Sequence, residues 1–255
     1  MNELTGKKVL VTGAAKGIGR GIALAFARAG AKLFLHYRSN PEEAHSLLDE
    51  VKALGTDAVA YRADLSKMDE LEAMFGTIKE QFGTLDAAVN NAGWDPGSVA
   101  TEDIDETLYY KLTDMNIKGT LFCCLRELEL MPSGGSIINL GSVQMNTTVT
   151  GRILYATSKG AIHSMTGALA LEAGPRGIRV NTIAPGYIAV ERMISRPGFD
   201  QKEIAAGIPV RRLGLPEDVG ELAVFLASEK AGFIHGETIV IDGGVNRKLA
   251  RSASV

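Results

Sequence analysis

The feature that most constrains the fold of this chain is a short apolar strand that runs into a glycine-rich turn and then into a helix. Residues 7–13, KKVLVTG, are rich in β-branched residues and end in glycine, whereas residues 17–30, GIGRGIALAFARAG, have helical spacing and a glycine stop. Strand-like and helical runs keep alternating as far as residue 244. This alternation predicts an α/β fold, a doubly wound parallel sheet with helices on both faces.

The strand-like runs lack strict polar–apolar alternation, which predicts strands that are buried on both faces of the sheet. The second strand is followed by Asn40 and Pro41, which predict a helix N-cap and the first helical position. No repeat, low-complexity tract or long linker interrupts the pattern, so we expect one domain over residues 1–244 and a basic tail at 245–255. Further strands are expected within residues 31–38, 57–65, 85–93, 135–142, 178–186 and 237–244.

Composition excludes several classes of protein. The chain has 255 residues, 45% of them hydrophobic, and a formal net charge of -3, which argues against a binder of nucleic acid or anionic membranes. No apolar run approaches the ~20 residues of a membrane helix, and the first residues lack the apolar stretch of a signal peptide. Cys123 and Cys124 lie in an apolar helical pattern, which predicts reduced core thiols. We expect a cytoplasmic protein with a small-molecule substrate.

The turn after the first strand has the composition of a phosphate-binding loop. Gly13 permits a tight turn, Gly17 lets the backbone approach a pyrophosphate, and Gly19 allows close packing of the helix. The helix N-terminus adds free amides and a partial positive charge. The spacing differs from the commoner G-x-G-x-x-G, and on their own the glycines could be turn residues. Their position predicts a dinucleotide site.

The end of the second strand indicates which dinucleotide binds. An acidic residue there would hold the ribose hydroxyls of NAD, whereas a cation would accommodate the 2′-phosphate of NADP. This chain has Arg38 and Ser39 at that point, and Lys16 in the glycine turn supplies a second cation. The alternative is that Lys16 and Arg38 are ordinary solvated surface charges. We therefore expect NADP(H) in preference to NAD(H). Asp64 fits a partner for the adenine amino group or, alternatively, a helix N-cap.

A serine, a tyrosine and a lysine near the fifth strand-like run form a chemical set. A tyrosine side chain ordinarily has a pKa of about 10 and is a poor acid or base at neutral pH. Lys159 lies four residues after Tyr155, on the same side of a helix, so its ammonium, joined by an oxidised nicotinamide, is expected to lower the pKa of the phenol. Ser142 follows a strand, and its hydroxyl can hydrogen-bond the substrate oxygen that exchanges a proton with Tyr155. The alternative is that each side chain only caps, packs or faces solvent.

Together these motifs resemble the short-chain dehydrogenase/reductase family. The resemblance rests on residues 12–19, NNAG at 90–93, Asn116 in DMNIKG, the Ser142, Tyr155 and Lys159 set, and Pro-Gly at 185–186, in that order along nearly the whole chain. It implies a Rossmann-type fold, hydride transfer between a nicotinamide and a carbonyl or alcohol, a proton relay through Asn116, and a homotetramer.

The resemblance and the pattern together assign site residues. Val190 stands where the family often has a threonine that contacts the nicotinamide. The four histidines show no metal-site spacing, so we expect no metal and no catalytic histidine. The expected catalytic residues are Asn116, Ser142, Tyr155 and Lys159. The expected cofactor-binding residues are Gly13, Lys16, Gly17, Ile18, Gly19, Arg38, Ser39, Asp64, Leu65, Asn91, Gly93, Tyr155, Lys159, Pro185, Gly186 and Ile188. The expected substrate residues are Trp94, Gln144 and Tyr187, under a mobile lid at 187–213.

Three hypotheses for the function remain at this stage. The first is a reductase or dehydrogenase for a small polar carbonyl or alcohol, sugars and polyols included, which Asp95, Gln144 and Asn146 would suit. The second is a 3-oxoacyl-[acyl-carrier-protein] reductase, which needs basic groups at the site mouth; residues 126–133, RELELMPS, offer no basic cluster, and Arg176 is the candidate. The third is a cofactor-binding regulatory protein without turnover, against which the intact catalytic set argues.

Overall fold

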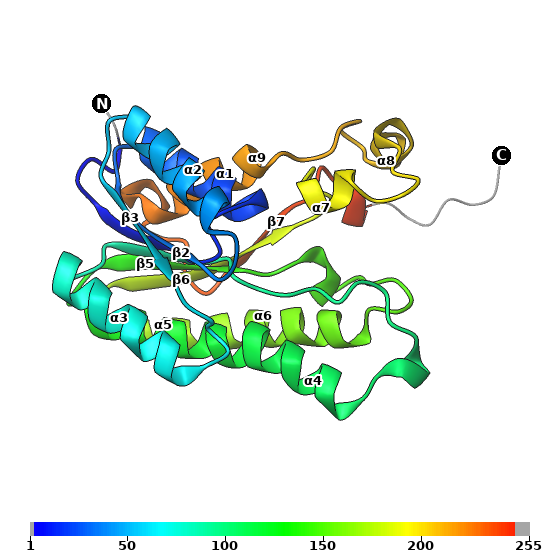
Figure 1. Ribbon diagram of the computed structural model, residues 1–255, viewed down its shortest axis with the longest axis horizontal. Coiled ribbons are helices and arrows are strands. Elements are labelled where there is room, and N and C mark those ends of the chain that lie inside the picture. Colours follow the sequence, from blue (N-terminus) through cyan, green and yellow to red (C-terminus); the bar gives the residue numbers. More distant parts are fainter. Residues whose placement is uncertain (1–2, 248–255) are drawn as a thin grey trace.

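Seven parallel strands form one sheet in the computed structural model, which describes residues 3–247 (Figure 1). The strand order is β3-β2-β1-β4-β5-β6-β7, and every neighbouring pair is parallel. The order reverses between β1 and β4, and a crevice is expected outside the carboxyl ends of the strands at such a point. The strands are β1 (Lys8–Val11), β2 (Lys32–Tyr37), β3 (Ala58–Arg62), β4 (Ala87–Asn90), β5 (Gly135–Leu140), β6 (Ile178–Pro185) and β7 (Thr238–Ile241).

Helices cover both faces of the sheet, as predicted (Figure 1). One face carries α1 (Gly17–Arg28), α2 (Pro41–Ala53) and α9 (Pro216–Ala227). The other carries α3 (Met68–Phe82), α4 (Glu106–Thr113), α5 (Thr120–Leu130) and α6 (Ile153–Ala173). Two short helices, α7 (Glu191–Ile194) and α8 (Gln201–Gly207), belong to the expected lid. The α/β, doubly wound architecture predicted from the alternating pattern is confirmed.

Burial along the strands follows their place in the sheet. All of β4 and nearly all of β6 are buried, which agrees with the missing polar–apolar alternation in their sequences. The edge strands β3 and β7 are mostly half-buried, because each has a neighbour on one side only. The sheet thus separates two apolar cores, one beneath α1, α2 and α9 and the other beneath α3, α5 and α6.

One helix start and the chain end differ from the sequence expectation. Helix α2 begins at Pro41 as expected, but Asn40 does not cap it: the residue has a φ of 71°, and its side-chain amide donates to the Glu43 carboxylate. A left-handed Asn directs its side chain away from the free amides of the first turn. The expected tail begins with a short 3-10 turn at Val245–Arg247, and residues 248–255 lie outside the described part of the chain. Within residues 3–247, no helix is both long and apolar enough to span a bilayer.

A buried chain of polar side chains crosses the middle of the sheet behind the carboxyl edge. The Asn90 amide donates to Asn139 and to Glu127, Asn139 donates to Thr166, and Thr166 pairs with Thr182. Glu127 is fully buried on α5, beside the free thiols of Cys123 and Cys124, which are core residues as expected. Burial raises the pKa of the Glu127 carboxyl to about 8, against the opposing effect of the Asn90 hydrogen bond. Glu127 is therefore expected to be largely neutral at pH 7.

The raised pKa of Glu127 predicts a specific dependence of stability on pH. The folded pKa of about 8 exceeds the ordinary value of 4.5, so the fold prefers the protonated carboxyl. Its contribution to stability is fully present below pH 4.5 and is lost as the pH rises toward 8. A Glu127→Gln variant cannot ionise, so its free energy of unfolding should exceed that of the wild type by a margin that grows over this window, on the order of a few kcal/mol.

Chemical denaturation at several pH values between 5.5 and 8.5 measures this margin. Glu129→Gln is the matched control, because Glu129 lies on the same helix but is exposed and pairs with Arg126 at the surface. The control should show no comparable growth with pH. If the difference in free energy of unfolding between Glu127→Gln and the wild type did not change with pH, this carboxyl would not titrate in the folded protein.

Candidate active site

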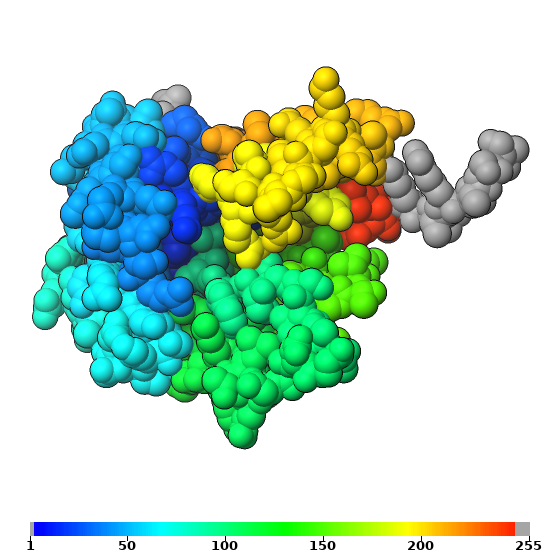
Figure 2. Space-filling model, turned by 45° about the vertical axis from the view of Figure 1, so that its right-hand side comes forward, coloured from blue at the N-terminus to red at the C-terminus, as the bar shows by residue number. Residues whose placement is uncertain are grey.

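Two adjoining clefts open at the carboxyl edge of the sheet, and Figure 2 shows the molecule hollowed between the blue, green and yellow segments. The first, the glycine-loop cleft, has a volume of about 790 Å³ and runs from the turn after β1 past the end of β2 to α6. The second, the lid cleft, has a volume of about 710 Å³ and lies between residues 142–155 and the lid. Tyr155, Pro185 and Val190 line both clefts, so the two spaces meet at the phenol.

The glycine turn is tightly built around its own backbone. Gly13 and Gly17 have φ values of 63° and 55°, in the left-handed region that favours glycine. A Cβ at Gly19 would lie 2.1 Å from the Gly13 carbonyl oxygen and 2.5 Å from Nδ2 of Asn91. Asn91 in turn donates to the carbonyl oxygens of Thr12 (3.0 Å) and Gly13 (2.9 Å). The NNAG segment therefore fixes the glycine loop from the neighbouring strand.

A second support of the loop is His36, for which the sequence suggested no role. The Gly13 amide donates to Nδ1 of His36 at 3.1 Å, which leaves Nε2 to donate to the Ala63 carbonyl at 2.9 Å. Burial lowers the pKa of the imidazole to about 4, partly opposed by the Ala63 hydrogen bond, so the ring stays neutral. The only sequence signal for this role is the position of the histidine near the carboxyl end of β2.

The glycine-loop cleft fits a dinucleotide. Gly17 and Gly19 place the N-terminus of α1 at its wall without side chains in the way, which suits a pyrophosphate. Lys16, Arg38 and Ser39 are exposed at one end of the cleft, and Tyr155 and Lys159 line the other. Twelve expected cofactor residues line this cleft: Gly13, Lys16, Gly17, Ile18, Gly19, Arg38, Ser39, Asn91, Gly93, Tyr155, Lys159 and Pro185.

Four of the expected cofactor residues lie elsewhere. Gly186 and Ile188 line the lid cleft instead. Asp64 and Leu65 line neither cleft: the Asp64 carboxylate accepts from the amide and hydroxyl of Ser66, and Leu65 is buried in the core beneath α3. Asp64 is thus held in a local turn, ahead of the start of α3 at Met68, which also rules out the alternative role as the cap of that helix.

Tyr155 lies near Ser142 and Lys159, as the spacing predicts, but the electrostatics differ from the expectation. The Lys159 ammonium donates to the Leu140 carbonyl at 2.7 Å and lies 5.7 Å from the centre of the Tyr155 ring. Burial raises the pKa of Tyr155 to about 12; Asp95 raises it further, while Arg152, Arg192 and a hydrogen bond with Ser142 lower it. Burial also lowers the pKa of Lys159 to about 8.

In the chain by itself, the nearby cations thus do not bring the pKa of this phenol below its ordinary value, and the expected lowering by Lys159 together with an oxidised nicotinamide stays a prediction. Desolvation of the phenolate outweighs the nearby cations, and the lysine charge is directed to a carbonyl oxygen. At neutral pH the Tyr155 phenol is protonated. In that state it is poised to give a proton rather than to take one.

Asn116 lies in a π-helical turn, Asp114–Gly119, which joins α4 to α5. Its side-chain oxygen accepts from the Trp94 amide at 2.7 Å, and its nitrogen donates to the Trp94 carbonyl (2.8 Å) and the Ser158 hydroxyl (3.2 Å). Both N–H donors are thus engaged, and Asn116 lines neither cleft. The side chain holds the loop that follows NNAG in place.

One acidic and two basic side chains form an ion cluster beside the Tyr155 ring, and the sequence did not predict it. Asp95 pairs with Nη1 of Arg152 at 2.8 Å and with Nη2 of Arg192, which comes from α7 in the lid. The guanidinium carbon of Arg152 lies 4.6 Å from the centre of the Tyr155 ring, a cation–π contact, and its Nε donates to Gln144 at 3.0 Å. These residues come from three separate segments, so no local spacing could have indicated the cluster.

The expected substrate residues divide between the clefts. Gln144 and Tyr187 line the lid cleft, whereas Trp94 lines the glycine-loop cleft, with the Lys111 ammonium 4.4 Å from its ring centre. Val190 packs over Gly17 and precedes α7. A valine has no oxygen with which to cap that helix, and the structure records no side-chain cap there.

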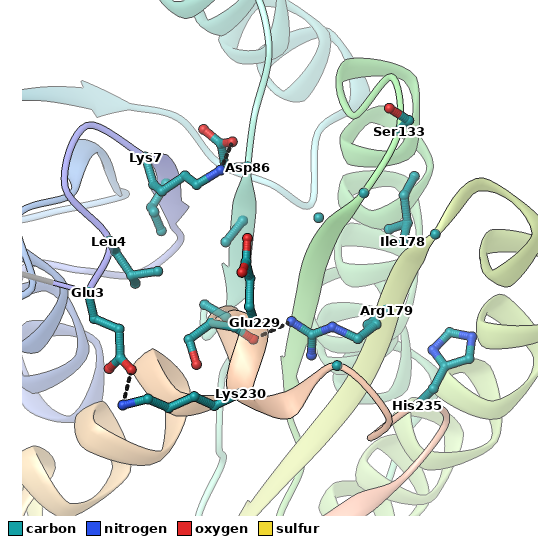
Figure 3. A pocket seen from close by; sticks show the side chains of 18 of the residues that line it. Glu3, Leu4, Lys7, Asp86, Ser133, Ile178, Arg179, Glu229, Lys230 and His235 are labelled. Atoms are coloured by element: carbon teal, nitrogen blue, oxygen red, sulfur yellow. Dashed lines mark hydrogen bonds and ion pairs between the residues drawn. The ribbon is translucent and has the colours of Figure 1, made fainter.

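A further cavity of about 910 Å³ lies at the opposite edge of the sheet, where the amino ends of β1, β4, β5 and β6 meet (Figure 3). Two ion pairs lie in this cavity, Lys7 with Asp86 and Lys230 with Glu3, and Nη2 of Arg179 donates to the Ser228 carbonyl. None of the expected site residues lines it. We therefore place the candidate site at the carboxyl edge. Within residues 3–247, no group of three or more His, Cys, Asp or Glu side chains could hold a metal ion.

A parallel sheet with a glycine loop at its switch point and a half-buried phenol between two clefts defines a class, the dinucleotide-dependent oxidoreductases of Rossmann type. A family model described as enoyl-(acyl carrier protein) reductase matches residues 13–246. The chain belongs to the short-chain dehydrogenase/reductase family, as its motifs predicted.

Relatives and solved structures agree with this placement. Glucose 1-dehydrogenase 2 of Bacillus subtilis is 36% identical over 248 residues, which cover 95% of this chain and 96% of that protein. A 3-oxoacyl-[acyl-carrier-protein] reductase of Staphylococcus aureus is 35% identical over 241 residues, with 94% and 98% covered. A short-chain dehydrogenase from Burkholderia cenocepacia, solved in complex with NADP, superimposes with a TM-score of 0.89 at 30% identity, over 96% of this chain and all of that one.

Proposed function

We propose that this oxidoreductase transfers hydride between NADP(H) and a small polar carbonyl or alcohol, with Tyr155 as the proton donor and acceptor. The observation that carries the proposal is the position of the half-buried Tyr155 side chain, which lies where the glycine-loop cleft meets the lid cleft. A dinucleotide in the first cleft and a substrate in the second would both reach it. In reduction, the carbonyl carbon gains a hydride and its oxygen gains the phenolic proton, which yields the alcohol.

Each of the three neighbouring groups has a distinct part in this proposal. Tyr155, protonated at neutral pH, donates its proton to the substrate oxygen. Ser142, already hydrogen-bonded to the phenol, stabilises the charge that develops on that oxygen. Lys159 would hold the ribose hydroxyls of the dinucleotide and, from its contact with the Leu140 carbonyl, adds a buried positive charge. Bound NADP(H) would supply the hydride and, when oxidised, a positive ring near the phenol.

Asn116 and the loop residues have positioning parts. The Asn116 amide fixes the main chain at Trp94, directly before Asp95, so it sets the place of the ion cluster over the phenol. The proton relay that the family resemblance implies for Asn116 remains a prediction, and the engaged side-chain donors do not favour it. Asn91 and His36 hold the glycine loop.

Preference for NADP(H) is supported by Lys16 and Arg38, exposed cations at the same end of the cleft, and by Arg62, whose Nε donates to the Arg38 carbonyl. An Arg38→Asp variant should bind NADP(H) roughly 10- to 100-fold more weakly, because a 2′-phosphate would then face an anion. Its affinity for NAD(H) should hold or rise, since a carboxylate there accepts from ribose hydroxyls. Fluorescence titration with each reduced dinucleotide measures both constants.

Arg28→Asp is the control for the change of charge, because Arg28 is exposed near the end of α1, where it pairs with Glu221. The control should keep the wild-type ratio of affinities. If Arg38→Asp also kept that ratio, the end of β2 would not select the dinucleotide.

The polar walls of the lid cleft support a small polar substrate, with sugars and polyols included, and the relative named as a glucose dehydrogenase agrees with this. The alternative is a 3-oxoacyl-[acyl-carrier-protein] reductase, the name of another relative. Arg176 cannot serve that role, because its guanidinium donates to the Leu128 and Met131 carbonyls at the far edge of the sheet. Arg192 and Arg196 do line the mouth, so a basic surface exists there.

We also propose a homotetramer in the cytoplasm. Large apolar side chains remain exposed on α6 and around the edge strand β7, and such faces are expected to be covered by symmetry mates. The reduced setting of Cys123 and Cys124 supports the cytoplasm. Sedimentation velocity gives the mass that tests the assembly. The exposed residues are Ile153, Leu171, Phe225, Phe233 and Val240.

The direct test of the proposed function is the oxidation of NADPH with a panel of small ketones, aldehydes and sugars. The wild-type protein should turn over at least one of them, and a Tyr155→Phe variant should not. Turnover that is equal in the two proteins would overturn the assignment of Tyr155.

A further inference from the structure

The lid cleft carries an excess of positive charge. Among the described residues that line it, Arg152, Arg192 and Arg196 are cations and Asp95 is the one acid. Asp95 stays ionised: burial raises the pKa of its carboxyl, but hydrogen bonds from Arg152, Arg192 and the Gly97 amide hold it at about 2. The charged side chains of the cleft therefore sum to two positive charges.

The side-chain oxygens of Asp95 and Gln144 already accept from the two arginines and from a main-chain amide. Asp95 Oδ1 pairs with Arg152 and accepts from the Gly97 amide at 2.9 Å, and Oδ2 pairs with Arg192. Gln144 Oε1 accepts from Nε of Arg152. These contacts leave Asp95 and Gln144 fewer lone pairs for the hydroxyl groups of a neutral polyol, and the expectation that they suit a hydroxylated substrate stays a prediction.

Hydrogen-bond donors, in contrast, remain free in the lid cleft. A guanidinium has five N–H groups, and the contacts of Arg152 with Asp95 and Gln144 involve only Nη1 and Nε. The Gln144 amide nitrogen and the hydroxyls of Ser142 and Tyr155 face the same space. A cleft with a net positive charge and free N–H donors matches a ligand rich in acceptors, such as a carboxylate or a phosphate.

The two arginines that pair with Asp95 differ in how exposed and how tightly packed their side chains are. The Arg152 side chain is 9% exposed and stacks on the Tyr155 ring, so it has a fixed position beside the phenol. The Arg192 side chain is 57% exposed and extends from α7 in the lid to both the carboxylate and the main-chain carbonyl of Asp95. Arg192 is thus the partner that can turn toward a ligand as the lid moves, while Arg152 still balances Asp95.

We propose that the carbonyl substrate carries an anionic group, a carboxylate or a phosphate, which Arg152 and Arg192 bind while the carbonyl faces Tyr155. This inference rests on the proposed function and narrows its substrate class. Because Arg152 lies against the ring of Tyr155, the anion and the reacting carbonyl belong to one short molecule. The Arg192 contact also draws the lid over the substrate.

Matched substrate pairs test the proposal by turnover with NADPH. The first set is 2-, 3- and 4-oxopentanoate, each against its methyl ester, and the second is dihydroxyacetone phosphate against dihydroxyacetone. For at least one pair, kcat/KM should be at least about tenfold higher for the anion, since one charge-assisted contact is worth roughly that factor. The two sets distinguish a carboxylate from a phosphate. A neutral member that is preferred throughout, or a neutral 3-oxoacyl N-acetylcysteamine thioester that exceeds every anion, would overturn the proposal.

Arg192→Gln should reduce the anion-over-neutral ratio about tenfold, through a higher KM for the anion rather than a lower kcat. Arg211→Gln is the matched control: Arg211 is an exposed lid arginine that does not line the cleft, and its guanidinium donates to the Ala206 carbonyl. The control should keep the wild-type ratio. A ratio that is unchanged in Arg192→Gln would remove Arg192 from the site.

Binding without turnover separates this inference from the proposed function. Calorimetric titration with malonate and with neutral malonamide, at saturating NADP⁺, should show malonate binding at least about tenfold more tightly, and Arg192→Gln should abolish the difference. If malonate behaves so and no carbonyl is reduced, the proposed reaction fails and the anion site stands. If malonamide binds as well as malonate, the anion site fails whatever the enzyme reduces.

Discussion

A Tyr155→Phe variant should lose roughly three orders of magnitude in kcat/KM for carbonyl reduction while it keeps its fold and its affinity for the dinucleotide. The change removes one oxygen, the atom that gives the proton to the substrate, and general acid catalysis of this kind contributes typically ~10²–10⁴. The ring itself remains, so the Arg152 stack and the packing of α6 are conserved. The loss should therefore appear mainly in kcat.

Tyr110→Phe is the matched control, because Tyr110 is 53% exposed on α4 and lines neither cleft. Thermal unfolding and NADPH titration should give wild-type values for both variants, and only Tyr155→Phe should lose turnover. If Tyr155→Phe retained most of its activity, the proton would come from another group, and Lys159, with a pKa lowered to about 8 by burial, would be the next candidate.

Tyr155 serves the two directions of the proposed reaction in different protonation states. Reduction needs the phenol, which the pKa of about 12 keeps in place, whereas oxidation of the alcohol needs the phenolate. Near pH 7 the chain by itself holds the form that can donate a proton. Oxidation depends on the positive charge that an oxidised nicotinamide brings to the site.

The sequence predicts the fold because each of its signals is local. Apolar runs, turn glycines and the Pro41 helix start lie within a few residues of the elements that they define, and buried strands follow from the missing alternation. The glycine loop and the Tyr155–Lys159 spacing are likewise local, so the structure places them at one edge of the sheet, as expected.

What the sequence could not predict depends on side chains that meet from distant segments. Asp95, Arg152 and Arg192 are separated by 57 and 40 residues, and each alone has the appearance of an ordinary surface charge. The electrostatics also escaped prediction, because the spacing of Tyr155 and Lys159 gives a shared helix face but not the depth of burial. The contact of the Asp64 carboxylate with Ser66 in its own turn was likewise not evident from the sequence, and its role as a cofactor residue stays a prediction.

The second large effect is expected at Gly19, where a single methyl group should disable the dinucleotide site. In a Gly19→Ala variant the new Cβ would lie 2.1 Å from the Gly13 carbonyl oxygen and 2.5 Å from the Asn91 amide nitrogen. Neither neighbour can yield easily, because the first is backbone and the second donates to Thr12 and Gly13. The loop must shift, which should weaken dinucleotide binding by a hundredfold or more and lower the free energy of unfolding by about 1–3 kcal/mol.

Gly76→Ala is the control variant for Gly19→Ala. Gly76 lies within α3, where a Cβ meets no atom within 4 Å, so alanine should be neutral or should stabilise the helix by up to about 1 kcal/mol. NADPH titration and chemical denaturation of both variants measure the two effects. A Gly19→Ala protein that is destabilised yet binds NADPH normally would mean that the phosphates lie away from this turn, because a site on the turn could not survive its displacement.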